Sequence, residues 1–179
     1  MEISLGIIIG SIIGLIILSA FFSGAETSLT SASKARIHNL AKSGEKNAIA
    51  YEKLFKKKEQ LIGTILLANN LVNVLASALA TSVLLEFFDS DGIFYVTIIM
   101  TLMILLFGEL LPKTIALFKA DYIALKISPV FSILTSIFLP ITSSLNVIVD
   151  FLIKSLRIKN LKNISTTESE EELRGAIDL

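Results

Sequence analysis

Long apolar stretches alternate with short charged connections along this chain. Three of the stretches are apolar on most helical faces and cover residues 3–29, 61–85 and 93–118. Each exceeds the roughly 20 residues that an α-helix needs to cross a hydrocarbon core of about 30 Å. The first stretch follows Glu2, has no basic residue before it and is longer than the apolar part of a secretory signal. We therefore predict three membrane-spanning helices, of which the first is retained in the mature protein.

The charges between the apolar stretches set the predicted orientation. The connection over residues 34–59 carries eight basic residues: Lys34, Arg36, Lys42, Lys46, Lys53, Lys56, Lys57 and Lys58. The connection over residues 86–92 carries acidic residues and no basic one. Because basic residues concentrate in cytoplasmic loops, we place residues 34–59 on the cytoplasmic side and the amino terminus outside.

A fourth apolar stretch, residues 127–153, is ambiguous. Basic residues flank it on both sides, which a single crossing does not satisfy. They are Lys113, Lys119, Lys126, Lys154, Arg157, Lys159 and Lys162. Pro129 and Pro140 should also divide this stretch into pieces too short to cross alone. The pattern favours interfacial or re-entrant helices against the inner leaflet, with a fourth span as the alternative.

The predicted fold is an all-α integral membrane domain over residues 1–159. Juxtamembrane helices at 34–59 and 121–158 form a belt on its cytoplasmic side. The tail over residues 160–179 changes character, because a polar linker leads into an acidic, solvated helix. The few apolar residues of that helix have nothing in this chain to pack against, so we expect the tail to be the start of a cytosolic region.

Composition narrows the chemistry. Of 179 residues, 53% are hydrophobic and 18% are charged, and the 16 basic residues balance the 16 acidic ones, so nothing in the overall charge points to nucleic acid. The chain has no cysteine and one histidine, His38, which excludes thiolate sites and disfavours multi-histidine metal centres. A serine nucleophile would lack a base at membrane depth, so we do not expect an enzyme.

Polar residues at membrane depth are costly and indicate functional sites, and the first predicted span carries a cluster of them. Ser19, Ser23 and Glu26 surround Gly24, where helix propensity is low. Local unwinding there would free backbone carbonyls that can bind cations. The alternative is that the hydroxyls bond back to carbonyls one turn earlier in an ordinary helix.

The second predicted span carries Asn70 and Asn73 on one helical face, with Ser77 one turn later. The two asparagines lie about 14 to 18 Å along the helix at 1.5 Å per residue. Buried amides need hydrogen-bond partners. A binding site and structural hydrogen bonds between helices are both compatible with this pattern.

The third predicted span carries Glu109 between Gly108 and Pro112. Pro112 has no amide hydrogen and crowds the carbonyl of Gly108, so the backbone there should be loosened. Glu109 lies about 24 Å along the helix, still within the hydrocarbon core if the helix is steep. The alternative is an ion pair between Glu109 and Lys113 near the inner interface.

Together the three clusters supply carboxylate, amide and hydroxyl oxygens. Such a set selects hard cations, among them Mg²⁺, Ca²⁺, Mn²⁺ and Na⁺. A single carboxylate neutralises a divalent ion only by half, which favours weak binding and release, as transport requires.

Three motifs in this order resemble the transmembrane domain of the CNNM/CorC family. They are Ser-Gly-Ala-Glu-Thr-Ser at 23–28, Asn-Asn-Leu-Val-Asn at 69–73 and Gly-Glu-Leu-Leu-Pro-Lys at 108–113. The resemblance implies a multi-pass homodimer in the cell membrane that exports Mg²⁺, driven by the Na⁺ gradient. It also implies a cytosolic pair of CBS modules that this sequence does not contain.

The resemblance further implies a dehydrated Mg²⁺ ion held between the three helices in an inward-facing cavity. Its implied ligands are Ser23, Asn70, Asn73 and Glu109. A backbone carbonyl near Ser19 would be a further ligand. The alternative function is a Mg²⁺ sensor or scaffold that transports nothing and regulates other transporters.

Overall fold

The computed structural model describes residues 5–87 and 90–155, and every element in these ranges is helical. In chain order the elements are α1 (Leu5–Ser31), α2 (Lys34–Lys42), α3 (Lys46–Phe55), α4 (Lys58–Phe87), α5 (Ser90–Met103), the π-helix η1 (Ile104–Leu110), α6 (Leu111–Phe118) and α7 (Ala120–Ser155). The predicted tail at 160–179 lies outside the described residues. The chain divides into two compact units, Met1–Leu139 and Pro140–Leu179, and the packing described below is that of the first.

Four helical segments are long and apolar enough to cross a membrane. They are Gly6–Ser31, Lys58–Ser82, Phe94–Phe118 and Ala120–Ile153. The predicted all-helical membrane fold is therefore confirmed for the described residues. The number of crossings and the outside position of the amino terminus stay predictions.

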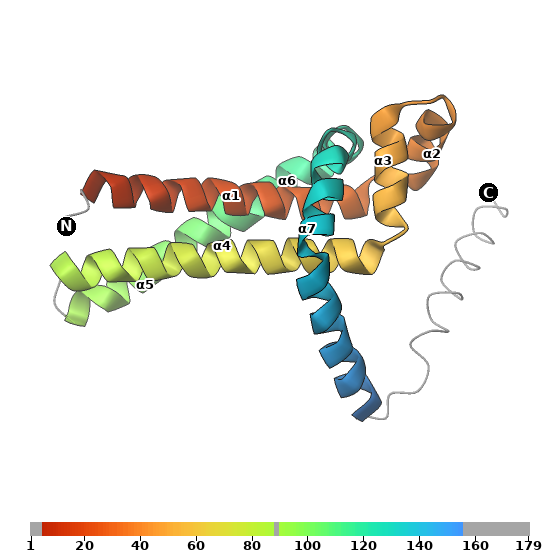
Figure 1. Cartoon of the computed structure of the whole chain (residues 1–179). Helices are drawn as coiled ribbons and strands as arrows, with labels where there is room; N and C mark the ends of the chain where they lie inside the picture. The colour runs from red at the N-terminus through yellow and green to blue at the C-terminus, as the bar shows by residue number, and fades with distance from the viewer. Residues whose placement is uncertain (1–4, 88–89, 156–179) are drawn as a thin grey trace, which may run out of the picture. The chain divides into compact units, whose positions relative to one another are not determined.

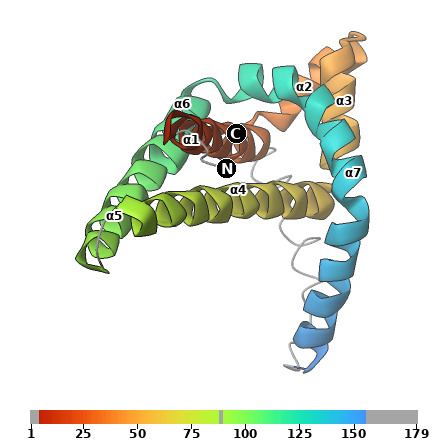
Figure 2. The same ribbon diagram turned by 60° about the vertical axis from the view of Figure 1, so that its left-hand side comes forward.

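α1 is the central helix of the first unit. Figure 1 shows α1 and α4 side by side along much of their lengths, and α1 also packs on η1 and α6. Both helices carry buried alanines, Ala25 on α1 and Ala68, Ala76 and Ala80 on α4, and small residues of this kind let helices approach closely. In Figure 2 the run from α5 through η1 to α6 starts beside the end of α4 and reaches α1 at α6.

α2 and α3 form a helical hairpin at the end of α1. Gly44 makes the turn between them with a φ of 90°, a conformation that suits glycine because it has no Cβ. Tyr51 of α3 donates its hydroxyl hydrogen to the carbonyl of Leu29 in α1 at 2.8 Å. Burial raises the pKa of Tyr51 to about 12, and the negative charge of Asp121 adds to the shift. The hairpin is thus fixed to α1 by a buried phenol.

The first half of α7 is fixed to α1 and α2 by two kinds of contact. Asp121 accepts a bond from the Ser33 backbone N–H at 2.7 Å and one from the Arg36 guanidinium at 2.6 Å. Further along, the buried Phe131 stacks on Phe21 with ring centroids 5.7 Å apart. Polar contacts therefore hold the start of α7, and aromatic packing holds its middle.

The helix interruptions expected at three positions are wrong. α1 runs through Gly24, and α7 runs through Pro129 and Pro140, each as one helix. A proline removes a single amide hydrogen bond, while the high cost of unpaired backbone groups in apolar surroundings favours keeping all the others. Gly24 instead permits a close contact, because a Cβ there would lie 3.6 Å from the carbonyl oxygen of Pro112. Residues 127–153 are therefore not divided into short pieces.

Candidate functional site

Glu109 is the meeting point of three helices. Asn73 of α4 donates from Nδ2 to the Glu109 carboxylate at 3.4 Å, and Ser23 of α1 donates from Oγ to the Glu109 backbone carbonyl at 3.3 Å. Ser23 is fully buried, and Asn73 and Glu109 are half-buried. Three of the four residues implied as ligands thus lie together. Their role in binding a metal stays a prediction.

The π-helix η1 shapes the backbone around Glu109. Residues 104–110 are wound more widely than an α-helix, as happens mostly in short turns at functional sites. Pro112 has no amide hydrogen for the Gly108 carbonyl, so the loosening expected from the sequence is found here. Gly108 is buried, and a Cβ on it would lie 3.1 Å from Ser19 Oγ. The missing side chain therefore lets η1 lie directly against α1.

A second polar contact, between α1 and α4, involves a residue that the sequence reasoning missed. Ser19 donates from Oγ to the side-chain oxygen of Asn69 at 3.1 Å, and both residues are buried. Asn69 and Asn73 stand four positions apart, so they share the face of α4 that packs on α1. The helical spacing of the small residues Ala76 and Ala80 continues that face and is the signal that could have identified it.

Asn70 and Ser77 do not join the other candidates. Both are exposed in this chain, on the side of α4 away from the buried stripe. The sequence predicts that Asn70 and Asn73 lie on one face of the helix, but only Asn73 points toward the site. In the described part of the chain, Asn69 and not Asn70 contributes the second inward-facing amide.

Asn73 leaves one strong acceptor without a partner. Its Oδ1 is buried and accepts no hydrogen bond within the described part of the protein, while its Nδ2 donates to Glu109. A buried amide oxygen without a donor is destabilising, and such atoms call for an explanation. An amide oxygen of this kind is among the ligands that hard cations prefer.

Glu26 and Lys113 form an ion pair next to this site. Lys113 Nζ lies 3.4 Å from Glu26 Oε2, with the side chains 42% and 25% exposed. Lys113 is thus paired with Glu26, and the alternative pairing of Lys113 with Glu109 is wrong. Among the described residues no group of three or more His, Cys, Asp or Glu side chains could hold a metal ion. Glu109 is the carboxylate that contacts Asn73, whereas Glu26 is paired with Lys113.

The fold and this constellation define an integral membrane protein with polar groups at the contact of three apolar helices. The chain belongs to the CNNM family: the Cyclin M transmembrane N-terminal domain matches residues 10–179. The expected resemblance is confirmed over nearly the whole chain. Members of this family are generally transporters rather than enzymes.

Several relatives are similar to this chain over most of its length. The UPF0053 inner membrane protein YfjD of Escherichia coli is 37% identical over 160 residues, which are 89% of this chain and 37% of YfjD. A UPF0053 protein of Haemophilus influenzae is 36% identical, over 90% of this chain and 38% of its own length. The chain thus spans less than two fifths of either relative. The expected location in a cell membrane is confirmed by these likenesses and by the apolar helices.

A more distant relative carries a functional name. The polyamine export protein of Haemophilus influenzae is 24% identical over 173 residues, which are 89% of this chain and 40% of that protein.

Proposed function

We propose that this chain binds and transports Mg²⁺ at the site around Glu109. The observation that carries the proposal is the unpartnered, buried Oδ1 of Asn73 beside the Glu109 carboxylate. Carboxylate, amide and hydroxyl oxygens are the ligands that hard cations prefer. The motif resemblance to the CNNM/CorC family implies the same cargo, and we propose with it export by a homodimer, driven by a Na⁺ gradient.

The contact geometry suggests how the ion would enter. The bond from Asn73 to Glu109 is long, at 3.4 Å, and therefore weak, so an arriving cation can replace it. Glu109 then supplies the full negative charge, and the Asn73 oxygen and Ser23 hydroxyl replace part of the ion's water shell. We expect the π-helix to be the element that moves, because π-helical turns inside α-helices occur frequently at functional sites.

The decisive experiment is Mg²⁺ flux into liposomes that contain the purified chain and a trapped Mg²⁺-sensitive dye. Glu109→Gln keeps the shape of the side chain and removes its charge. We expect flux to fall by about tenfold or more, because a bond to a charged group is worth about 1.5 to 3 kcal/mol.

The matched control is Glu59→Gln, which removes a carboxylate from an exposed position at the start of α4. Its flux should equal that of the unaltered chain. Equal flux for Glu109→Gln and the unaltered chain would remove this site from the transport mechanism.

Two other functions are tested by the same preparation. A Mg²⁺ sensor or scaffold would bind Mg²⁺ in calorimetry, with the affinity reduced by Glu109→Gln, and would give no flux. The similarity to a polyamine export protein raises polyamines as a second cargo, since their ammonium groups also bind carboxylates. Spermidine flux that exceeds Mg²⁺ flux and depends on Glu109 would favour the polyamine.

A further inference from the structure

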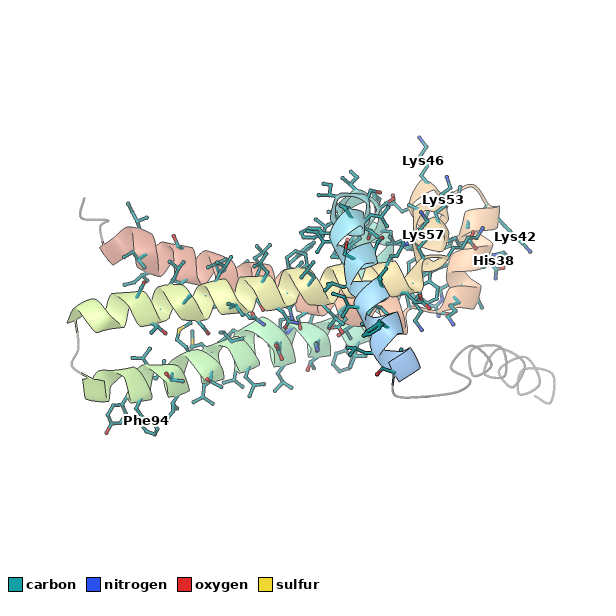
Figure 3. The ribbon with its side chains drawn as sticks, turned by 60° about the horizontal axis from the view of Figure 1, so that its bottom comes forward. His38, Lys42, Lys46, Lys53, Lys57 and Phe94 are labelled. Atoms are coloured by element: carbon teal, nitrogen blue, oxygen red, sulfur yellow. The ribbon has the colours of Figure 1, made fainter. Side chains whose placement is uncertain are left out.

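A cationic pocket lies on the α2–α3 hairpin, formed by residues other than those around Glu109. Its volume is about 480 Å³, and its lining includes Lys34, His38, Tyr51, Glu52, Phe55 and Lys56. In Figure 3 the labelled His38, Lys42, Lys46, Lys53 and Lys57 gather at this end of the first unit, and Phe94 on α5 lies at the opposite end. The pocket thus lies in a segment, residues 34–58, that carries eight lysine and arginine residues.

The lysines of this pocket have no acidic partners. Lys34 Nζ lies 5.3 Å from the centre of the Phe55 ring, and Lys58 Nζ lies 5.7 Å from it. The ion pairs among the described residues are Arg36–Asp121, His38–Glu52 and Lys113–Glu26, so none of them includes Lys34, Lys56 or Lys58. Glu52 is the acidic side chain of the lining, and the 2.6 Å contact with His38 Nδ1 occupies its Oε1.

The floor of the pocket is aromatic and rigid. The rings of Tyr51 and Phe55 stack with centroids 5.4 Å apart and planes 13° apart. The Tyr51 hydroxyl is already bonded to Leu29, so it holds the floor in place and is not free to bind a ligand. An anion in the pocket would therefore bind the ammonium groups, of which that of Lys34 lies over the Phe55 ring by a cation–π contact.

The position of the pocket indicates which kind of molecule binds there. The apolar segment Gly6–Ser31 ends just before Lys34, and the apolar segment Lys58–Ser82 begins just after Lys56. The pocket therefore lies where two membrane-spanning helices leave the hydrocarbon core, at the level of the lipid headgroups. We propose that it binds the negatively charged headgroup of an anionic phospholipid, with the phosphate at Lys34 and Lys56 of the lining.

The test is lipid binding to the purified whole chain in a mild detergent, followed by native mass spectrometry. Phosphatidylglycerol and phosphatidylcholine with identical acyl chains are titrated separately. One variant combines Lys34→Gln and Lys56→Gln. A control combines Lys42→Gln and Lys46→Gln, which remove the same charge from the same hairpin outside the pocket lining. Circular dichroism establishes that both variants are folded.

We expect the unaltered chain to prefer phosphatidylglycerol. The pocket variant should bind it about 30-fold more weakly, or about fivefold for each lysine, while the control changes little. Restoring the charges with Lys34→Arg and Lys56→Arg should restore binding.

Three results would overturn the proposal. Equal loss in the pocket variant and the control would mean that diffuse surface charge attracts the lipid. Equal binding of the two lipids would mean that the pocket does not distinguish a negatively charged headgroup from a neutral one. Displacement of the lipid by millimolar glycerol phosphate would mean that the pocket takes soluble phosphates.

Discussion

Gly108 and Gly24 form a matched pair of probes for the packing of α1 against the third apolar segment. A Cβ on Gly108 would lie 3.1 Å from Ser19 Oγ and 3.5 Å from Ser19 Cβ, so Ser19 must give way by a few tenths of an ångström. A Cβ on Gly24 would meet Pro112 at 3.6 Å, which is an ordinary van der Waals distance. An alanine at either position adds one methyl group. That methyl group is too close to Ser19 at position 108, whereas at position 24 it makes an ordinary contact.

The structure allows the two effects to be estimated. Alanine stabilises a helix interior relative to glycine by about 0.5 to 1 kcal/mol, and at Gly24 nothing opposes this gain. At Gly108 the displaced Ser19 hydroxyl already donates to Asn69 at 3.1 Å, so the same methyl weakens a buried hydrogen bond. That loss is worth about 0.6 to 1.5 kcal/mol. We expect Gly24→Ala to raise the free energy of unfolding, and Gly108→Ala to leave it unchanged or lower it.

The assay is reversible unfolding in mixed micelles, titrated with dodecyl sulfate and followed by circular dichroism. Gly10→Ala provides the baseline, because no other atom of the described chain outside its own helical backbone lies within 4 Å of a Cβ at that position. Gly24→Ala and Gly10→Ala should shift the midpoint similarly, and Gly108→Ala should fall about 1 kcal/mol below both. If Gly108→Ala stabilises the fold as much as Gly24→Ala, the contact with Ser19 is looser than described and the reasoning fails.

Three further predictions concern single contacts. Asn69→Leu should lower the free energy of unfolding by about 1 kcal/mol in the same titration, because Ser19 loses its acceptor, whereas Asn70→Leu at an exposed position should change it little. Tyr51 has a pKa raised from 10 to about 12, so its stabilising contribution should be complete below pH 10 and disappear as the pH rises through 12. Thermal unfolding of Tyr51→Phe should lack this alkaline loss. Asp121→Asn should cost less than about 1 kcal/mol, because Arg36 is 71% exposed, and a loss that persists in 1 M salt would contradict an ionic origin.

The convergence of the polar clusters could be predicted because polar side chains stand out in apolar helices. Ser23, Asn73 and Glu109 each lie on a different apolar segment, and burial in a bilayer makes such residues costly unless they meet partners. No knowledge of the packing angle is needed to expect that they meet. In the structure Ser23 and Asn73 each contact Glu109, and a shared metal site stays a prediction.

The choice between neighbouring asparagines could not be made in the same way. Asn69 and Asn70 are about 100° apart on the helix. α4 is apolar on most faces, so hydrophobic periodicity does not show which face packs on α1. Only the spacing of the small residues Ala76 and Ala80, which follow Asn69 on the same helical face and are buried with it, distinguishes Asn69 from Asn70.

The incorrect helix interruptions share one physical cause. Propensities measured in water treat Gly24 and Pro140 as weak points, because water can satisfy the backbone groups that an interruption exposes. Among apolar helices those groups have no such partner, so the helix continues. The backbone departs from α geometry at η1, where Gly108 and Pro112 lie close together and Ser23 donates a hydrogen bond to the Glu109 carbonyl.

The winding of η1 has a geometric consequence for everything that follows it. A π-helical turn accommodates an extra residue, so rewinding Ile104–Leu110 as α-helix would rotate the downstream side chains by about 100° around the axis. Lys113 would then turn away from Glu26, and Pro112 would leave Gly24. A change confined to these seven residues would therefore rotate α6 about its own axis. A different side of α6 would then face α1, and no hinge between domains would be needed.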